Sequence, residues 1–490
     1  MIIWGITALG HDGAISVVKD EDILFAGHSE RYSRVKNDPY LNNEIVEEAL
    51  SYGEPNEIIW YEKPLLKKSR QAWAGQWKEV FGKNTMPKPY LKKFFNKLPT
   101  VSSIRHHEAH AAAGVLTSNY NEAVVIVLDA IGEWNCCTIW DWKDNELKLI
   151  ERNNYPHSFG LFYSAFTQRC GLKPNEEEYI LMGMAAYGQP IYKDKIWNDF
   201  INDNLTFKKN LHVGVGYDYL PDADIMDIAS SVQEIAEQFI FEYASRSMLL
   251  TGYNNLVYMG GVALNCVANT RLYELFDNIW IMPNPGDAGN SLGAAISKNK
   301  EYGNRVNWKG PFLGTNIEGE YPCASIVQEL YKNKICGVAN GRAEFGPRAL
   351  GNRSLLADPR GEDIKDKVNK IKKRQKFRPF APAILEEHLG EYFKIPTTKS
   401  PYMQFIADAK MITKKNYPAI IHADGTSRVQ TVSKEDNPGF RKLLENWFAE
   451  TGCPMLLNTS LNIKGEPLVN TEKHANDFEN KYNTKVFTKE

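Results

Sequence analysis

The sequence predicts an α/β protein in which a duplicated α/β unit is followed by a second α/β domain. Three observations indicate this class. Strand-length apolar runs alternate with segments of helical periodicity, two of those runs end in a similar acidic turn (at Asp12 and at Asp129), and the apolar periodicity lapses once, between residues 298 and 320. A length of 490 residues, of which 43% are hydrophobic and 24% charged, leaves room for two or three compact domains.

The elements of the first domain follow in order along the chain. Residues 2–18 are expected to form a strand, a turn at 10–13 and a second strand, and residues 123–128 and 256–259 to form buried strands. Helical spacing covers residues 42–51, 103–116 and 225–250, and residues 283–295 are expected to be a loop entering a helix of small residues. The third helix carries one apolar stripe, formed by Ile228, Val232, Ile235, Phe239 and Tyr243.

The domain boundaries follow from the lapse in periodicity. We expect the first domain at residues 1–305, a linker at 306–320 and the second domain at 321–490. The second domain is expected to begin with a strand at 335–339, to pass through a basic helix near 364–373 and to close near 455–458. The last ~20 residues are polar and are expected to form a peripheral tail.

Composition excludes several classes of protein. Lys and Arg number 58 against 60 Asp and Glu, a balance of 58 − 60 = −2, so no global field selects for nucleic acid or an anionic membrane. The 7 cysteines are scattered and contain no C-x-x-C pair, which argues against a disulfide framework and favours a reducing compartment. Since the N-terminus lacks a cationic leader and no apolar run approaches the ~20 residues of a membrane span, we expect a cytoplasmic protein.

Two histidines and two aspartates are candidate metal ligands. His106 and His110 lie four residues apart in a helical stretch and therefore project from one face, although such a pair alone is more often two hydrogen-bonded, partly buried histidines. Asp129 ends a buried strand and Asp287 lies in a glycine-flanked turn, positions at which α/β sheets present ligand groups. Two imidazoles with two carboxylates suit iron, manganese or zinc and leave room for a substrate oxygen.

A glycine pair at the end of a strand is a weaker candidate. Gly260 and Gly261 allow the backbone to approach a flat or anionic ligand, but they do not form a G-x-G-x-x-G motif, and a plain tight turn explains them equally well. The segment 344–353 lacks the G-K-[ST] of a P-loop, so classical P-loop ATP binding is not supported.

Basic residues concentrate in one part of the second domain. Eight of the fourteen residues from Lys365 to Arg378 are Lys or Arg, a run for which a solvated helix face is the usual explanation. This run, however, enters the rigid apolar segment 377–382, and Arg428 adds a further cation on a predicted strand edge. Because the arginine fork suits phosphate, a phosphate site is the alternative explanation. The loop 458–467 adds amide and hydroxyl donors.

Taken together, these motifs resemble the O-carbamoyltransferase family of the tobramycin, cephem and Nod-factor type. The resemblance covers nearly the whole chain, and eight motifs occur in the family's order. They are the segments 106–114, 129–134, 181–188, 260–265, 286–289, 345–354, 377–382 and 458–467.

The resemblance implies a two-domain enzyme. The first domain would be Kae1-like, of the duplicated actin-like ATPase fold, and the second YrdC-like. The implied activity is ATP-dependent O-carbamoyl transfer. The second domain would use carbamoyl phosphate and Mg-ATP to make carbamoyl adenylate, and the first would pass the carbamoyl group to an acceptor hydroxyl of a natural product, sugar or nucleotide.

The resemblance also implies residue roles. The metal, most often Fe(II) with Mn or Zn as alternatives, would be held by His106, His110, Asp129 and Asp287. His11 would be the general base, and the first-domain nucleotide loop would contain Gly260, Gly261 and Asn265. Carbamoyl phosphate and ATP would be bound in the second domain by Arg348, Lys372, Arg378, Arg428 and Ser460. Ile180 departs from the family pattern, since it stands where many members carry a lysine.

Two other functions remain open at this point. Unfused Kae1-like and YrdC-like proteins take part in the threonylcarbamoyl-adenosine modification of tRNA, so an RNA-modifying enzyme is one alternative. A non-catalytic nucleotide-binding scaffold is another, although it leaves the four candidate metal ligands unexplained. We expect no membrane or nucleic acid partner, while a hydroxymethylated nucleobase or nucleotide stays open as acceptor.

Overall fold

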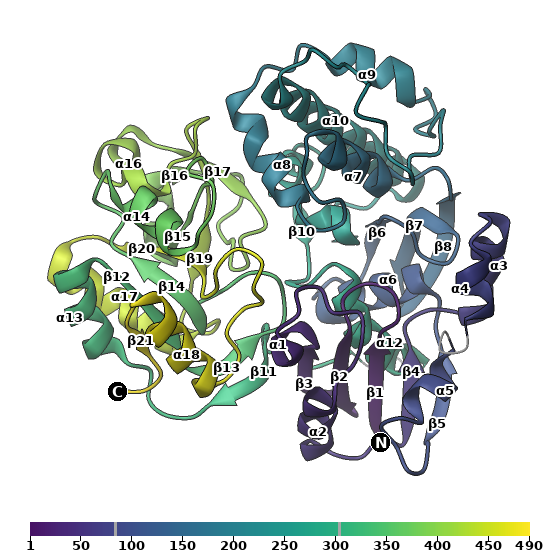
Figure 1. Cartoon of the computed structure of the whole chain (residues 1–490), viewed down its shortest axis with the longest axis horizontal. Helices are drawn as coiled ribbons and strands as arrows, with labels where there is room; N and C mark the ends of the chain where they lie inside the picture. Colours follow the sequence, from purple (N-terminus) through teal and green to yellow (C-terminus); the bar gives the residue numbers. More distant parts are fainter. Residues whose placement is uncertain (83–85, 302–304) are drawn as a thin grey trace. The chain divides into compact units, whose positions relative to one another are not determined.

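The computed structural model describes residues 1–82, 86–301 and 305–490. The chain divides into two compact units (Figure 1). Unit 1 contains Met1–Ser33 and Asn37–Trp308, and unit 2 contains Arg34–Lys36 and Lys309–Glu490. The segment 306–320, expected to be a linker, carries the strand β11 (Phe312–Ile317), which pairs with β13 (Gly341–Glu344). Because glycine, asparagine and proline surround β11, the apolar periodicity of the sequence did not predict this short strand.

The first sheet of unit 1 has the strand order β3-β2-β1-β4-β5. Strands β1 (Ile2–Thr7), β2 (Ala14–Lys19) and β3 (Asp22–His28) are antiparallel neighbours, which confirms the strand, turn and strand expected over residues 2–18. Strands β4 (Glu57–Trp60) and β5 (Thr100–Ser103) add in parallel. Helix α2 (Asn43–Ser51) begins where the Asn42 side chain accepts a hydrogen bond from the Ile45 amide.

The second sheet of unit 1 repeats this arrangement. Its order is β10-β9-β6-β7-β8, with β6 (Ala123–Leu128), β7 (Asn135–Lys143) and β8 (Glu146–Asn154) antiparallel. Strands β9 (Asn255–Met259) and β10 (Asn278–Trp280) add in parallel beside β6. The two sheets therefore share strand order and direction, as the two similar acidic turns predicted.

Two helices pack closely against the sheets of unit 1. Helix α12 (Asn290–Glu301) lies on β1, where a Cβ at Gly5 would come within 1.8 Å of the Ser291 carbonyl oxygen. It also meets α6 (His106–Thr117), where a Cβ at Gly293 would come within 1.9 Å of the Ala109 carbonyl oxygen. Glycine at these two positions allows backbone to touch backbone.

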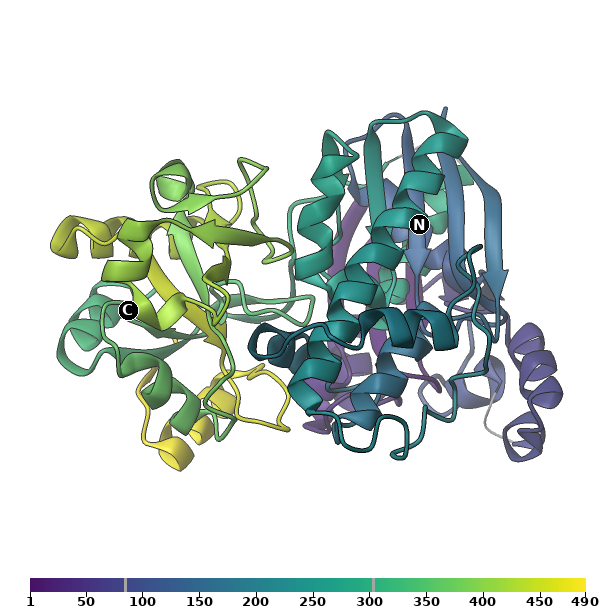
Figure 2. The same cartoon turned by 90° about the horizontal axis from the view of Figure 1, so that it is seen from above.

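The remaining helices of unit 1 form a helical layer and an edge. Helix α10 (Ile225–Thr251) buries all five residues of its predicted stripe and ends at Gly252, which has a φ of 74°. It packs with α7 (Phe159–Arg169), α8 (Glu178–Met184) and α9 (Lys193–Phe200). Helices α3 (Pro64–Trp73) and α4 (Trp77–Phe81) project at the edge of unit 1 (Figure 2). Shorter helices are α1 (Glu30–Ser33), α5 (Pro87–Leu91) and α11 (Cys266–Arg271).

Unit 2 is built on a six-stranded sheet of order β19-β15-β20-β14-β12-β21. Its strands are β12 (Ile335–Ala339), β14 (Arg353–Ala357), β15 (Ala381–Leu385), β19 (Gln430–Val432), β20 (Met455–Ser460) and β21 (Val486–Phe487). Strands β16 (Phe393–Lys394), β17 (Ile406–Ala409) and β18 (Thr426–Arg428) form a smaller sheet. The helices are α13 (Cys323–Asn333), α14 (Ile364–Ile371), α15 (Leu389–Tyr392), α16 (Met411–Asn416) and α17 (Pro438–Thr451).

The C-terminal residues are part of the core of unit 2. Helix α18 (Glu472–Tyr482) buries Ala475 and Phe478, and β21 pairs in parallel with β12. The expected polar tail is therefore wrong, because a few apolar residues among many polar ones are enough to dock this segment.

Membrane and disulfide features are also defined by the structure. None of the helices in the described ranges 1–82, 86–301 and 305–490 has both the length and the apolarity needed to cross a bilayer. All seven cysteines are buried and free of disulfide bonds.

Candidate active site

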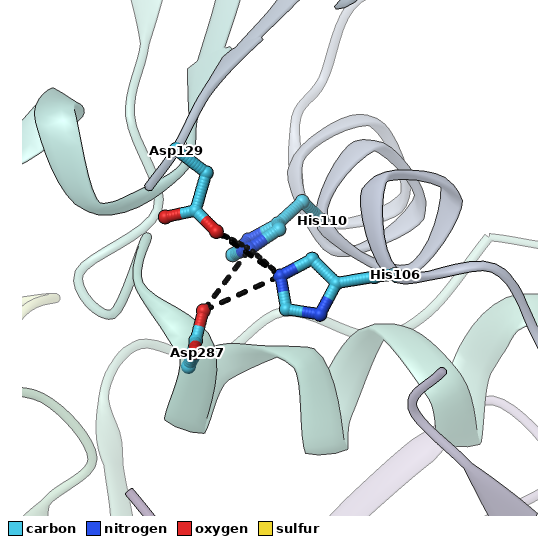
Figure 3. Close-up of side chains that lie close together, drawn as sticks. All are labelled: His106, His110, Asp129 and Asp287. Atoms are coloured by element: carbon cyan, nitrogen blue, oxygen red, sulfur yellow. Dashed lines mark hydrogen bonds and ion pairs between the residues drawn. The ribbon is translucent and has the colours of Figure 1, made fainter. Parts of the chain in front are cut away.

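The four predicted metal ligands converge in unit 1 (Figure 3). His106 and His110 occupy the first turns of α6, Asp129 follows β6, and Asp287 lies in the short turn Asp287–Gly289 that leads into α12. One ligand atom from each residue lies within 4.8 Å of all the others. Because these residues come from one helix, the end of one strand and a turn that lies far along the chain, only the tertiary fold brings them together.

The geometry of the cluster fits a divalent ion. His106 Nε2 lies 3.1 Å from Asp129 Oδ2, 3.2 Å from His110 Nε2 and 3.4 Å from Asp287 Oδ1. His110 Nε2 lies 3.6 Å from Asp287 Oδ1 and 3.9 Å from Asp129 Oδ2. Ligands bound at about 2.1 Å to one ion are separated by roughly 3.0–3.4 Å, depending on the coordination angle. Small adjustments of the four side chains would therefore be enough for all of them to bind one ion.

Charges within the cluster are strongly coupled. Burial alone would lower the pKa of His106, but Asp287 and Asp129 raise it well above its ordinary value. Burial would raise the pKa of Asp287, but His106 and His110 hold it well below the usual range. Burial and the charge of Asp287 oppose ionisation of Asp129, yet its hydrogen bond from His106 lowers its pKa. Without an ion the cluster therefore holds a positive charge on His106, and a bound cation would replace that proton.

Two neighbouring groups hold the ligands in place. Glu133 is 2% exposed, and its Oε1 accepts hydrogen bonds from the His106 amide at 3.1 Å and the Lys63 amide at 2.7 Å. The Gly261 amide donates to Asp129 Oδ1 at 3.1 Å, which leaves Oδ2 toward the histidines. His107 is directed away from the cluster, since its Nδ1 lies 2.9 Å from Thr138 Oγ1.

His11 lies in the turn between β1 and β2. Its Nδ1 is 2.9 Å from Asp12 Oδ2, and its side chain is 39% exposed. Burial lowers the pKa of His11, but the hydrogen bond and charge of Asp12, followed by the charges of Asp287 and Asp129, raise it to about 9. The imidazole is therefore protonated at neutral pH, which differs from the neutral side chain that a base requires.

The glycine pair after β9 is a close backbone contact. Gly260 has a φ of 93°, and a Cβ there would lie 2.1 Å from the Leu128 carbonyl oxygen. Asn265 caps α11 through the Ala268 amide and exchanges hydrogen bonds with Gln233 at 3.0 and 3.1 Å. Gly260 and Gly261 therefore join β9 to the metal-ligand loop, whereas the nucleotide-binding role of these residues stays a prediction.

In unit 2 the structure brings Lys372 and Ser460 together. Lys372 is 3% exposed, and its Nζ lies 3.2 Å from Ser460 Oγ, 2.8 Å from the Asn462 carbonyl and 2.9 Å from Asn462 Oδ1. It also donates to the Ser460 carbonyl. Burial, Arg374 and Arg378 lower the pKa of Lys372 well below its usual range. Lys372 thus holds the loop after β20, and its role in binding carbamoyl phosphate or ATP stays a prediction.

Two arginines of unit 2, Arg374 and Arg378, lie close enough to Lys372 for their charges to influence it. Arg374 packs 4.2 Å from the Phe380 ring centroid and influences the pKa of both Lys365 and Lys372. Burial is the main cause that lowers the pKa of His422 to about 4; the charge of Asp424 opposes this shift, and the charges of Arg428 and Lys365 contribute to it. The basic cluster therefore includes Arg378 and Arg428, while Arg348 is partly buried in the loop between β13 and β14.

Family models match almost the whole chain. Residues 2–296 match the carbamoyltransferase N-terminus, and residues 327–488 match the carbamoyltransferase C-terminus. The chain belongs to the carbamoyltransferase family. This enzyme is 35% identical to an uncharacterised protein of Synechocystis, over 96% of its own chain and 93% of the relative.

Two further relatives are a nodulation protein and a carbamoyltransferase. The nodulation protein NolNO of Sinorhizobium fredii is 30% identical to this chain. The alignment covers 95% of this chain and 76% of NolNO. The 3'-hydroxymethylcephem-O-carbamoyltransferase of Amycolatopsis lactamdurans is 27% identical to this chain. The alignment covers 94% of this chain and 93% of the relative. Among solved structures, component A of (R)-2-hydroxyglutaryl-CoA dehydratase from Acidaminococcus fermentans gives a TM-score of 0.37 at 14% identity, covering 61% of this chain and 99% of its own.

Several residues of the carbamoyltransferase site carried no sequence signal of their own. Asn290 is fully buried with its Nδ2 3.4 Å from His106 Nε2, and the Tyr61 ring lies edge-on at 5.4 Å from His106. Asn462 and Glu133 lie within the motifs 458–467 and 129–134. Their individual roles become visible only in their contacts with Lys372 and His106. Ile180 is buried in α8 at 1% exposure, so the position of the missing lysine belongs to the apolar interior.

Proposed function

We propose that this carbamoyltransferase is an ATP-dependent O-carbamoyltransferase. In unit 2, water would cleave carbamoyl phosphate to carbamate and phosphate, and carbamate would attack the α-phosphate of Mg-ATP to give carbamoyl adenylate and pyrophosphate. In unit 1, the hydroxyl of a small-molecule acceptor would attack the carbamoyl carbon, and AMP would leave. The convergence of His106, His110, Asp129 and Asp287 in a chain of this family is the observation that carries the proposal.

The same proposal assigns the fold of each unit. The repeated strand order of the two sheets supports a Kae1-like, duplicated actin-like fold for unit 1. The basic cluster near a mixed sheet supports a YrdC-like fold for unit 2. The domain roles would then be carbamoyl transfer in unit 1 and activation in unit 2.

A divalent first-row ion, Fe(II) first with Mn or Zn as alternatives, would supply Lewis-acid polarisation of the carbamoyl group when bound by the four ligands. The residues around the ion would position its ligands. Glu133 holds the start of α6, and the Gly261 amide orients the Asp129 carboxylate. The carbamoyl carbon and the acceptor hydroxyl would thus be held in a fixed orientation relative to each other.

His11 is the proposed general base of the transfer step. Its Nδ1 is held by Asp12, so Nε2 is the atom that would take the proton from the acceptor hydroxyl. The charges of Asp287 and Asp129 help to raise its pKa to about 9. When a bound cation neutralises those carboxylates, two of the charges that raise the pKa of His11 are removed, so the pKa falls and the neutral imidazole that a base requires becomes more populated.

The proposed activation site uses the cations of unit 2. Carbamoyl phosphate and the triphosphate of ATP are anionic, and Arg348, Arg378 and Arg428 would bind their oxygens. Lys372 would fix the loop that presents Ser460 to them. The carbamoyltransferase family models do not favour the alternative of a threonylcarbamoyl-adenosine enzyme, which would consume threonine and bicarbonate.

One experiment tests the proposal. Purified protein is given ATP and carbamoyl phosphate, pyrophosphate is assayed, and carbamoyl adenylate is sought by mass spectrometry. The panel is then extended to sugars, antibiotics and nucleotides as acceptors. Pyrophosphate that depends on carbamoyl phosphate is the expected result. Pyrophosphate release with threonine and bicarbonate, or no release at all, would refute it.

A further inference from the structure

Helix α3 contains a buried arginine, Arg70. Its side chain is 6% exposed, and its Nε is enclosed without a hydrogen-bond partner. Within the described ranges 1–82, 86–301 and 305–490, neither Nη atom donates a hydrogen bond or forms an ion pair. The guanidinium does contact the Tyr155 ring, whose centroid lies 5.7 Å from its central carbon. A buried cation is costly unless an anion or several acceptors meet it, so this side chain requires an explanation.

The acidic groups near Arg70 do not compensate for its burial. Burial lowers the pKa of the guanidinium, and the opposing charges around it, among them those of Glu62 and Glu133, leave the pKa lowered. Glu62 Oε1 pairs instead with Lys67 Nζ at 2.8 Å. Glu133 Oε1 accepts two backbone amides, at 2.7 and 3.1 Å. Because both carboxylates have other partners, the guanidinium is left to bind an anion from outside the chain.

Arg70 lies on the side of α3 that faces the turn of the proposed base. Lys67 precedes it by three residues in the same helix, so the two side chains project from one side. A Cβ built on Gly10 would lie 3.3 Å from Lys67 Nζ, and Gly10 immediately precedes His11. An anion bound by Arg70 would therefore lie one helical turn from this contact.

Arg70 also lies beside the loop that follows Asp129. Cys136 and Glu133 are close enough for their ionised forms to act on the guanidinium. The Cys136 carbonyl accepts the Asp129 amide at 3.0 Å, and Glu133 Oε1 accepts the His106 amide at 3.1 Å. Arg70 is thus adjacent to the segment that holds two of the metal ligands, although none of its own atoms bonds to a ligand.

Aromatic rings lie next to the guanidinium. The Tyr155 ring that Arg70 contacts also meets the Trp73 ring edge-on at 5.8 Å, and Trp73 meets the Trp134 ring at 5.9 Å. Trp73 is 62% exposed, so a ligand can reach these rings from solvent. A cation beside aromatic rings favours an acid that is attached to an organic skeleton over a free inorganic ion.

We propose that Arg70 binds an acidic group, a carboxylate or a phosphate, of the carbamoyl acceptor. The planar guanidinium offers paired N–H donors in the geometry that both oxyanions accept. The acceptor is then an anionic alcohol, with its hydroxyl at His11 and its acidic group at Arg70. This inference rests on the proposed carbamoyl transfer. It adds the charge of the acceptor, which the four metal ligands leave open.

Aromatic probes that differ in charge test the inference. Benzoate, phenyl phosphate and the neutral benzamide are titrated into the full-length protein by calorimetry at constant ionic strength, and the tighter anion identifies the acid. At least one anion should bind tenfold more tightly than benzamide, because charge-assisted hydrogen bonds are the strong ones. Arg70→Gln should lose this preference. Lys68→Gln removes a cation from the other side of α3, where Lys68 Nζ donates to the Val80 carbonyl at 2.7 Å, and should keep it.

A stability measurement separates anion binding from a structural role of Arg70. Removal of an unpaired buried charge should not destabilise the fold, so Arg70→Gln should unfold at or above the wild-type temperature without an anion. The preferred anion should raise the midpoint of the wild type and not that of the variant. A lower midpoint of the variant, with the anion preference intact, would show that Arg70 serves the fold and would overturn the inference.

The outcomes also separate this inference from the proposed function. Equal binding of the three probes, or a preference that Arg70→Gln keeps, overturns the inference even if the wild type releases pyrophosphate. AMP is titrated as well, and a tenfold loss of AMP affinity in Arg70→Gln would assign the guanidinium to the nucleotide phosphate and overturn its assignment to the acceptor. Anion binding that depends on Arg70, in a protein that releases no pyrophosphate, would support the anion site and refute the activation chemistry.

Discussion

His106 and His110 are useful test residues because His107, between them, faces another way. The double variant His106→Ala, His110→Ala removes two of the four candidate ligands and should lose the metal. Elemental analysis of folded protein measures the loss. His107→Ala is the matched control and should retain the metal. Undiminished metal in the double variant would show that the ion is bound elsewhere.

Substitution of His11 should separate the two half-reactions. His11→Asn removes the proposed base but leaves the unit 2 cations unchanged. We expect the variant to release pyrophosphate and accumulate carbamoyl adenylate without carbamoylating an acceptor, because a neutral hydroxyl attacks poorly unless a base takes its proton. Mass spectrometry follows both products. Acceptor carbamoylation near the wild-type rate would mean that the proton leaves by another route.

The titration of His11 should depend on the metal. Its pKa is raised to about 9, so the protonated imidazole stabilises the metal-free fold fully below its ordinary pKa of 6.5. That contribution is lost as the pH rises through about 9. Proton NMR of metal-free protein should show this titration, and addition of Zn(II) should lower the pKa by neutralising Asp129 and Asp287. An identical pKa with and without the ion would contradict the coupling.

At the scale of elements, the loop after β20 depends on one buried ammonium. Lys372→Met leaves the Ser460 and Asn462 oxygens without their donor, so the loop should shift. Loss of a charge-assisted contact costs about 1.5–3 kcal/mol, and pyrophosphate release should therefore fall at least tenfold. Lys376→Met, an exposed position of the same basic run, is the control. A wild-type rate in Lys372→Met would exclude this loop from activation.

Helices and strands with a clear apolar periodicity could be predicted from the sequence. Elements that are stabilised mainly by pairing with a distant strand could not. The stripe of α10 and the strands β1, β2 and β6 follow from periodicity alone. Strand β11 and the segment containing α18 and β21 have little apolar content, and partners distant in the chain stabilise them. The same reason hid Glu133 and Asn290, since their contacts with His106 cross from other segments.

At the scale of the molecule, the two units should respond to different ligands. All four metal ligands belong to unit 1, and the basic cluster belongs to unit 2, which has its own apolar core. A ligand at 100 times its Kd stabilises the unit that binds it by about 2.7 kcal/mol, which raises a midpoint by several degrees. Calorimetry should show that the metal raises one transition and that ATP with carbamoyl phosphate raises another. A single transition shifted by both would contradict independent units.

The backbone contacts at Gly5 and Gly293 also bear on the four candidate metal ligands. Helix α12 touches β1 and α6 through backbone atoms, so a larger side chain at Gly5 or Gly293 would displace the helix and change the distances between Asp287 and the two histidines. Two backbone contacts that involve none of the four ligands therefore set the distances within the cluster, and a substitution at either glycine could disable the cluster while leaving every ligand in the sequence.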